Sequence, residues 1–213
     1  MVKYLGLFLV GLSCLSCSEP AAVKTENNQT VTPSDSIFEP AASQQTAFQI
    51  IPGQRIGQVA VGENPEKVFE ALGEADAGDA AMGKALSTWY SQDSGQRREL
   101  NVYTVTKKTG TPQQTVGVEQ VRITSPAYTV AETDISVGST LPQIRKHFPQ
   151  ARPIAYVEQE QQKIIVYDAP AQGIAFEIAG PDSSRVGITV HPTGSGAADA
   201  YLPIHPNLVR LKQ

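Results

Sequence analysis

The two cysteines of this 213-residue chain are the residues whose chemistry depends most clearly on their position. Cys14 and Cys17 both stand within the first twenty residues, and no cysteine follows them. A disulfide framework, a thiolate zinc site and a cysteine nucleophile are therefore excluded from the rest of the chain. The chemistry left to these thiols is modification near the N-terminus.

The segment ahead of Cys17 has the composition of a secretory signal. Lys3 gives a positive start, and Tyr4–Leu15 is apolar but shorter than the roughly 20 residues that cross a bilayer. Leu15-Ser16-Cys17 resembles the end of a bacterial lipobox, whose cysteine becomes lipid-modified and forms the mature N-terminus. We predict that residues 1–16 are a lipoprotein signal peptide and that Cys17 is the lipidation site.

Two alternatives to this lipidation site stay open. Cys14 is a second candidate, after Gly11-Leu12-Ser13, and an ordinary cleaved signal with incidental cysteines is another. Several acyl chains hold a protein stably at a membrane surface. Ser18, rather than an aspartate, follows Cys17, which resembles lipoproteins of the outer membrane. We therefore expect a lipid-anchored cell-envelope protein, in the outer membrane and facing the periplasm.

The three histidines offer little catalytic or metal chemistry. His147 stands beside Arg145 and Lys146, and His191 and His205 each precede a proline, so all three are expected to be structural residues at the surface. A metal site could form only if a carboxylate such as Asp168 or Asp182 lay close to the last two, and their spacing matches no standard motif. We predict no metal site.

Other catalytic patterns are also missing from the sequence. The stretch Gly194-Ser195-Gly196 lacks the pattern of a serine-nucleophile turn, and no glycine-rich phosphate loop occurs. Carboxylates are scattered singly, without the pairing that acid–base catalysis needs. The formal charge of −4 argues against nucleic acid as a partner. We predict no catalytic residue and no cofactor.

The elements that would position a site begin after a polar segment. Residues 17–47 are rich in Ser, Thr, Pro, Ala, Gln, Asn and Glu, which predicts a disordered tether. An internal repeat follows at a spacing of 76 residues, because residues 59–73 align without gaps to residues 135–149. We predict a first repeat at 48–128, a second at 129–193 and a loosely docked tail at 194–213.

Each repeat predicts a strand, a helix and three further strands. The helices are expected at Pro65–Leu72, after Asn64 as N-cap, and at Leu141–Phe148. Alternating apolar residues predict the strands after each helix. These are Leu86–Tyr90, Glu99–Val105, Val116–Ile123, Ile164–Tyr167, Gly173–Ile178 and Arg185–Val190. The expected fold class is α+β, with two short helices packed on one face of an antiparallel sheet.

The sheet face away from the helices is the predicted binding surface. If Leu100 and Val102 point to the helix, Tyr103 points away, and the same period of two exposes Arg122 and Glu177. Trp89 and Tyr167 are further candidates for this face. The aromatic residues could instead pack in the core, an alternative that we favour for Trp89 and leave open for Tyr103.

The first repeat resembles a known family. Gly62, Val68, Leu72 and Gly73, followed by Trp89-Tyr90, resemble the SmpA/OmlA-like small outer-membrane lipoproteins. The tandem arrangement resembles the β-lactamase-inhibitor-protein-like architecture over about residues 50–191, although Ile165-Val166 replaces Trp-Tyr in the second repeat. The resemblance implies protein recognition rather than catalysis.

These patterns predict a non-enzymatic protein-binding or scaffold module with an envelope protein as its partner. The alternatives are an envelope hydrolase whose site assembles only in the fold, and an inhibitor of an envelope enzyme. A pocket gathering His191, Asp168 and a serine would support the hydrolase, whereas an open aromatic face would support binding.

Overall fold

The structure is a computed structural model that describes residues 47–91, 95, 97–159, 162–180, 187–198 and 204–212. The predicted signal peptide, Cys14, Cys17 and the tether up to Thr46 lie outside the described residues, as does Asp182. Within the described ranges, no helix has the length and hydropathy of a membrane span.

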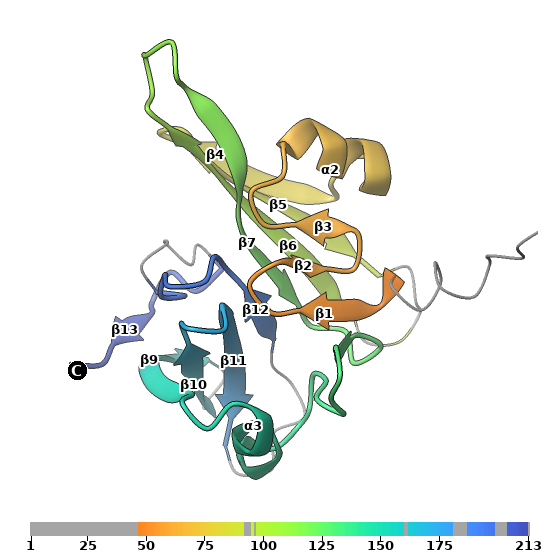
Figure 1. Cartoon of the computed structure of the whole chain (residues 1–213), viewed down its shortest axis with the longest axis vertical. Coiled ribbons are helices and arrows are strands. Elements are labelled where there is room, and N and C mark those ends of the chain that lie inside the picture. The colour runs from red at the N-terminus through yellow and green to blue at the C-terminus, as the bar shows by residue number, and fades with distance from the viewer. Residues whose placement is uncertain are drawn as a thin grey trace, which may run out of the picture. The chain divides into compact units, whose positions relative to one another are not determined.

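The predicted α+β fold class is wrong, because the protein is mostly β. Strands hold 45% of the described residues and helices 11%. The helices are too short to cover a sheet, and a second, smaller sheet takes most of the place expected for them (Figure 1). The strands of this smaller sheet have only two or three residues, and such short strands show no alternation that could be recognised in the sequence.

The larger sheet has nine antiparallel strands. Their spatial order is β13 (Val209–Arg210), β9 (Arg152–Gln159), β10 (Gln162–Ala169), β11 (Ile174–Ala179), β12 (Ile188–Val190), β7 (Thr115–Ile123), β6 (Glu99–Lys107), β5 (Lys84–Tyr90) and β4 (Ala77–Ala81). Because β12 pairs with β7, strands from both predicted repeats belong to one sheet.

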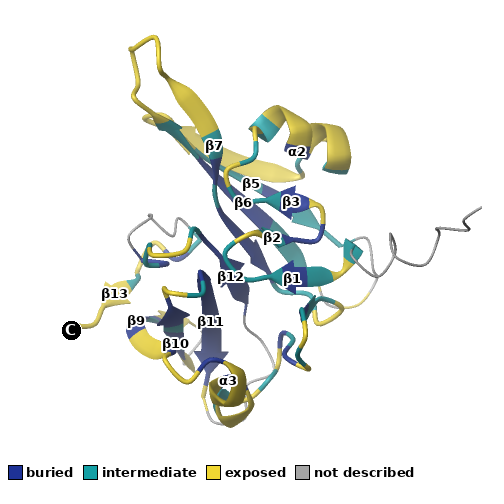
Figure 2. Cartoon of the chain, in the orientation of Figure 1, coloured by how far each residue is buried: buried dark blue, intermediate teal, exposed yellow. Residues whose placement is uncertain are grey.

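The smaller sheet has four short strands. Their order is β3 (Val59–Ala60), β2 (Arg55–Ile56), β1 (Gln49–Ile51) and β8 (Thr129–Val130), with β1 and β8 parallel and the other pairs antiparallel. This sheet and the helices contribute to one apolar core with the large sheet. The buried members include Ile50, Ile56, Val59, Val68, Val102, Val121, Ile144, Phe176, Ile188 and Val190 (Figure 2).

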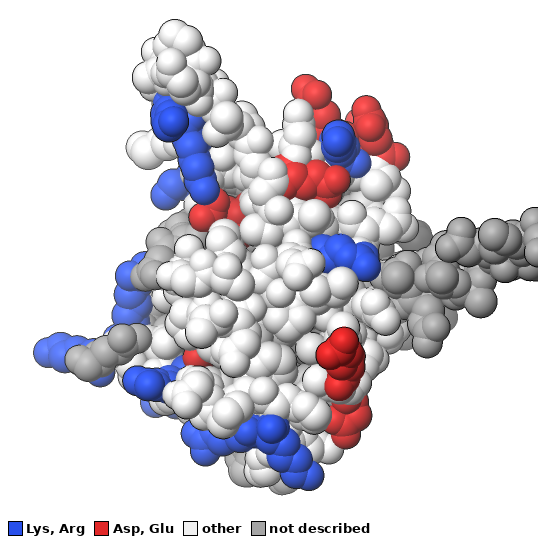
Figure 3. Space-filling view, viewed as in Figure 1, with Lys and Arg blue, Asp and Glu red and all other residues white. Residues whose placement is uncertain are grey.

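The two helices lie where the sequence predicts them. Helix α2 spans Pro65–Leu72, and the Asn64 side chain accepts a hydrogen bond of 2.9 Å from the Glu66 amide. Helix α3 spans Leu141–His147. Each helix buries one residue, Val68 or Ile144. Their outer faces carry charge, acidic around α2 and basic around α3 (Figure 3).

A close contact between two glycines joins the β1–β2 turn to the β10–β11 turn. The Gly53 amide donates a 3.1 Å hydrogen bond to Gly173 O. Gly173 has φ of 72°, and a Cβ there would lie 2.4 Å from His191 O and 2.6 Å from Gly53 Cα. Only glycine fits both this conformation and this space.

We expect Gly173→Ala to lower the free energy of unfolding by about 3 kcal/mol or more, because left-handed strain of about 1–2 kcal/mol adds to a backbone clash. Gly180→Ala is the matched control. Gly180 has φ of 65°, but a Cβ added there would have nothing within 4 Å, so only the strain applies. Urea unfolding measures both, and equal losses would contradict the close contact.

Candidate functional site

Three predicted binding residues lie on the sheet face opposite the main core. Arg122 stands between Val121 and Ile123 of β7, whose side chains belong to that core. In register beside it are Asn101 of β6 and Thr189 of β12. Tyr103 and Glu177 alternate with core residues in the same way on β6 and β11. The period of two therefore assigns their face correctly.

The predicted exposure of this face is wrong at these residues. Tyr103 is 4% exposed, Arg122 7% and Glu177 3%. The C-terminal part of the chain covers the face, because Ala197, Ala198 and Leu208 pack against Ala155, Val166 and Ala175. Residues 209–210 add β13 at the sheet edge beside β9. A partner cannot reach the side chains of Arg122 and Glu177 under this cover.

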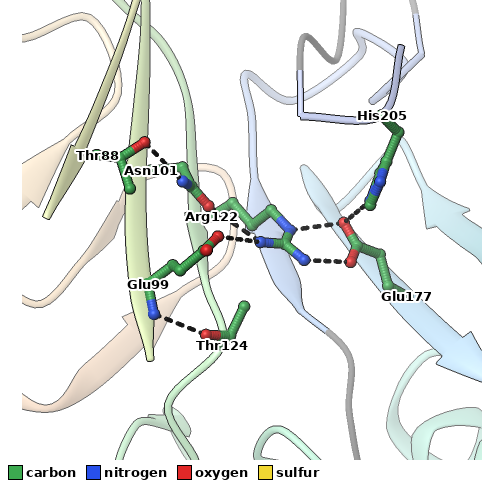
Figure 4. Close-up of polar contacts among 7 residues, drawn as sticks. All are labelled: Thr88, Glu99, Asn101, Arg122, Thr124, Glu177 and His205. Carbon is green, nitrogen blue, oxygen red and sulfur yellow. Dashed lines mark hydrogen bonds and ion pairs between the residues drawn. The ribbon is translucent and has the colours of Figure 1, made fainter. Parts of the chain in front are cut away.

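Arg122 is the centre of a buried polar network (Figure 4). Its Nε donates to Glu177 Oε1 at 2.7 Å and its Nη2 to Glu177 Oε2 at 2.6 Å, a bidentate ion pair. Nη1 donates to Asn101 Oδ1 at 3.0 Å and lies 3.6 Å from Glu99 Oε2. Asn101 Nδ2 in turn donates to Thr88 Oγ1 at 3.0 Å.

Two neighbouring residues, Gly187 and His205, adapt the surroundings of the network to the C-terminal segment that covers it. Gly187 leaves room for Arg122, since a Cβ there would lie 2.7 Å from Arg122 Nε. His205 Nε2 lies 3.3 Å from Glu177 Oε1, an ion-pair distance, but forms no well-aligned hydrogen bond. This contact places the C-terminal segment directly beside the network.

The charges of the pair shift both pKa values away from what burial alone would give. Burial would raise the pKa of Glu177, but the nearby positive charge of Arg122, with contributions from His205, outweighs it and lowers this pKa well below its ordinary value. Burial would lower the pKa of Arg122, and the charge and hydrogen bonds of Glu177, with Glu99, raise it instead. Both groups are held in their charged forms.

The two remaining candidates face the main core. Trp89 is half-buried, packs against that core and meets the Phe69 ring at 5.6 Å, while its Nε1 donates to Gly73 O at 3.1 Å. Tyr167 is also half-buried against the core, with Arg145 5.9 Å from its ring centre. Both contacts fit a packing role.

His191 and His205 are not surface residues, contrary to the sequence prediction. His191 is fully buried, and its Nε2 lies 3.0 Å from Asp168 Oδ1 while its Nδ1 lies 3.1 Å from Pro192 O. Asp168 Oδ2 also accepts a 2.8 Å hydrogen bond from the Ala197 amide. His147 is exposed as predicted and lies 3.4 Å from Asp134.

This pair bears on the alternative hydrolase function. Ser195 and His191 both line a cavity of about 250 Å³, together with Lys84, Tyr103, Val105, Lys107, Glu119, Gln120, Pro192 and Gly196. A Ser-His-Asp site needs one ring nitrogen on the carboxylate and the other on the serine oxygen. Here the second nitrogen of His191 faces the Pro192 carbonyl. The contacts of His191 with Asp168 and Pro192 stabilise the turn after β12. His191 is therefore not placed to activate Ser195.

The outer end of β4 and β5 is exposed, unlike the covered face. Met82 and Gly83 form the two-residue turn between these strands, with φ of 54° and 74°. Met82 is 99% exposed. A cavity of about 220 Å³ lies beside the turn, lined by Asp79, Ala81, Met82, Lys84, Ala85, Leu86 and Tyr103.

Sequence reasoning did not find this end of the sheet. Met82-Gly83 is not one of the residue pairs typical of a two-residue hairpin, and Ala77, Gly78 and Ala80 give β4 no strand-like pattern. Among the described residues, no three His, Cys, Asp or Glu side chains gather where they could hold a metal ion. Comparison with family models, curated proteins and solved structures gave no match, so the lipoprotein-family resemblance stays a prediction.

The buried ion pair predicts a specific loss of stability in acid. The pKa of Glu177 is lowered on folding from its ordinary value of 4.5, so its contribution is present above pH 4.5 and is lost as the pH falls towards the folded value. Below pH 4.5 the free energy of unfolding should fall with a slope from this group that approaches about 1.4 kcal/mol per pH unit.

The double variant Arg122→Gln/Glu177→Gln is the control, because it removes both charges and keeps a hydrogen-bonding side chain at each position. Urea unfolding between pH 5 and pH 3 should give a shallower pH dependence for the variant than for the natural chain. Equal slopes would show that Glu177 does not titrate as an ion-paired group.

Proposed function

We propose that this protein is a lipid-anchored module of the cell envelope that binds another envelope protein without catalysis, through the β4–β5 end of its large sheet. The observation that carries the proposal is Met82, a nearly fully exposed apolar side chain at a positive φ. The membrane anchor at Cys17 and the outer-membrane location rest on the sequence pattern described above.

Met82 destabilises this turn in two ways. A turn with two positive φ values favours Asn, Asp or Gly, and a residue such as Met pays about 1–2 kcal/mol of left-handed strain. The full exposure of its thioether side chain also leaves apolar surface in water. Because Asn, Asp or Gly would form the same turn with less strain, folding does not explain the presence of Met82, and a role in binding does.

The surroundings of Met82 suit a protein partner. The apolar residues Ala81, Ala85 and Leu86 line the cavity beside it, with the Tyr103 ring. Val116 of β7, 44% exposed, lines a second cavity together with Met82. Methionine adapts its shape readily at binding surfaces, and an apolar centre with a polar rim is typical of an interface.

The anchor is tested by Cys17→Ser. If Cys17 carries the lipid, the variant should lose incorporation of labelled fatty acid and move from the membrane fraction to the soluble periplasmic fraction. Cys14→Ser is the matched control and should keep both properties. Continued lipid incorporation in Cys17→Ser would move the anchor to Cys14.

The binding surface is tested by Met82→Asn. We expect the fold to gain about 0.5–1 kcal/mol, part of the left-handed strain, because Asn tolerates this conformation. Loss of the apolar side chain should weaken partner binding at least about tenfold, as a buried Met contributes about 1.5–3 kcal/mol and about 1.4 kcal/mol is a factor of ten. A photo-crosslinking amino acid at position 116 measures the adduct formed with the partner in intact envelopes.

Glu132→Asn is the control for the turn. Glu132 also has a positive φ, 61°, but lies after β8, outside the β4–β5 end. It should gain similar stability while the crosslinked adduct stays unchanged. An undiminished adduct in Met82→Asn, or an equal loss in both variants, would count against the proposed surface.

A further inference from the structure

Strand β4 ends the large sheet with an open backbone edge. It pairs with β5 on one side, and no described strand pairs with it on the other. All five of its residues are exposed. The opposite edge of the sheet is β13, which has only two residues. The longer edge is therefore the one able to pair with a further strand.

The residues of β4 do little to block this edge. Proteins usually protect exposed edges with Pro, Lys, a bulge or a covering segment. The sequence Ala77-Gly78-Asp79-Ala80-Ala81 has no Pro or Lys, and its pairing with β5 is regular. Gly78 has no side chain to cover this backbone, and a Cβ there would lie 2.9 Å from Leu86 O, so a larger residue does not fit.

The hairpin fixes which backbone groups point outward. A two-residue turn closes on a hydrogen-bonded pair, here Ala81 with Lys84, and such pairs alternate along an antiparallel ladder. Ala81, Asp79 and Ala77 therefore bond to β5. Gly78 and Ala80 direct their N–H and C=O groups away from β5, where an added strand would bond to them.

Hollows lie on both faces of the sheet next to β4. Tyr103 and Leu86 are among the residues that line the first, the cavity of about 220 Å³. The second, of about 340 Å³, is lined by residues that include Ala80, Ala85, Thr104 and Val116. Alternate side chains of an added strand point to opposite faces, so each hollow would receive side chains from one strand.

The charge of Asp79 favours a different protein over a second copy of this chain as the partner of β4. Full antiparallel pairing of β4 with β4 of a second copy sets Asp79 opposite Asp79, and like charges directly opposite destabilise a pair. A strand with Lys or Arg opposite Asp79 gains an attractive pair instead. An apolar residue opposite Ala81 would lie beside the cavity that Leu86 and Tyr103 line.

We infer that β4 accepts an extended segment of another protein as a tenth, antiparallel strand, with a basic residue opposite Asp79 and an apolar residue opposite Ala81. The inference rests on the proposed binding function and names its mode and its kind of partner. Main-chain hydrogen bonds at Gly78 and Ala80 would give affinity, and the side chains on either face would give specificity.

The probe is the acetylated and amidated peptide Thr-Leu-Val-Lys-Val-Thr, which places Leu opposite Ala81 and Lys opposite Asp79. Isothermal titration calorimetry with the full mature chain should show saturable binding below about 1 mM. The same peptide with both valines N-methylated loses the donors that face Ala80 and Gly78, and should bind at least about tenfold more weakly. Replacing its Lys by Glu should also weaken binding.

Ala80→Pro tests the edge from the protein side. It removes an outward N–H that makes no bond within the sheet, and should weaken peptide binding at least about tenfold, whereas Ala80→Thr keeps the N–H and should bind normally. If Ala80→Pro fails to fold, the affinities of the methylated and unmethylated peptides for the natural chain still test whether the peptide binds as an added strand.

Absence of binding by the unmethylated peptide, or equal affinity of the methylated one, would overturn strand addition. The proposed function would fail separately, through an unchanged crosslink at position 116 in Met82→Asn. A crosslink that is lost in Met82→Asn but kept in Ala80→Pro would leave the function and overturn the strand mode.

Discussion

The second face of the large sheet is organised around the buried positive charge of Arg122. A buried cation without a partner is strongly destabilising, so its donors must find acceptors within the protein. Those acceptors come from β6 and β11, on either side of β7 and β12. A one-residue slip of β7 would turn Arg122 into the apolar core. The ion pair with Glu177 therefore fixes the register of the central strands.

The need of each buried charge for a partner also explains how the C-terminal segment packs on the rest of the fold. Glu177 lies beside His205, and Asp168 holds both His191 and the Ala197 amide. Two buried carboxylates of the sheet thus receive partners from the chain that follows β12. The arrangement of Asp168, His191 and Ser195 gathers residue types found in hydrolases, but its hydrogen bonds serve this cover rather than a nucleophile.

Local signals in the sequence predict the parts of this fold that depend on neighbours in the chain. Asn64 and Gly73 mark the ends of α2, and the alternation around Arg122 assigns its face. The fold class and the exposure of the face could not be predicted in this way. The small sheet is built from strands of two or three residues, and the cover from small residues and prolines without periodicity. The fold class and the burial of this face depend on contacts between residues far apart in the sequence, such as that of His205 with Glu177.

The proposed binding surface lies where the rest of the fold does not depend on it. Met82 and the open edge of β4 lie at one end of the sheet, and β5 is the one described strand that pairs with β4. A strand added there would leave the contacts of Arg122, Glu177 and His205 unchanged, because these lie on the central strands and their cover. In the proposed function, binding depends on Met82 and Ala80, which lie outside the ion-pair network, so substitutions at these two positions should change partner binding and leave the buried charges in place.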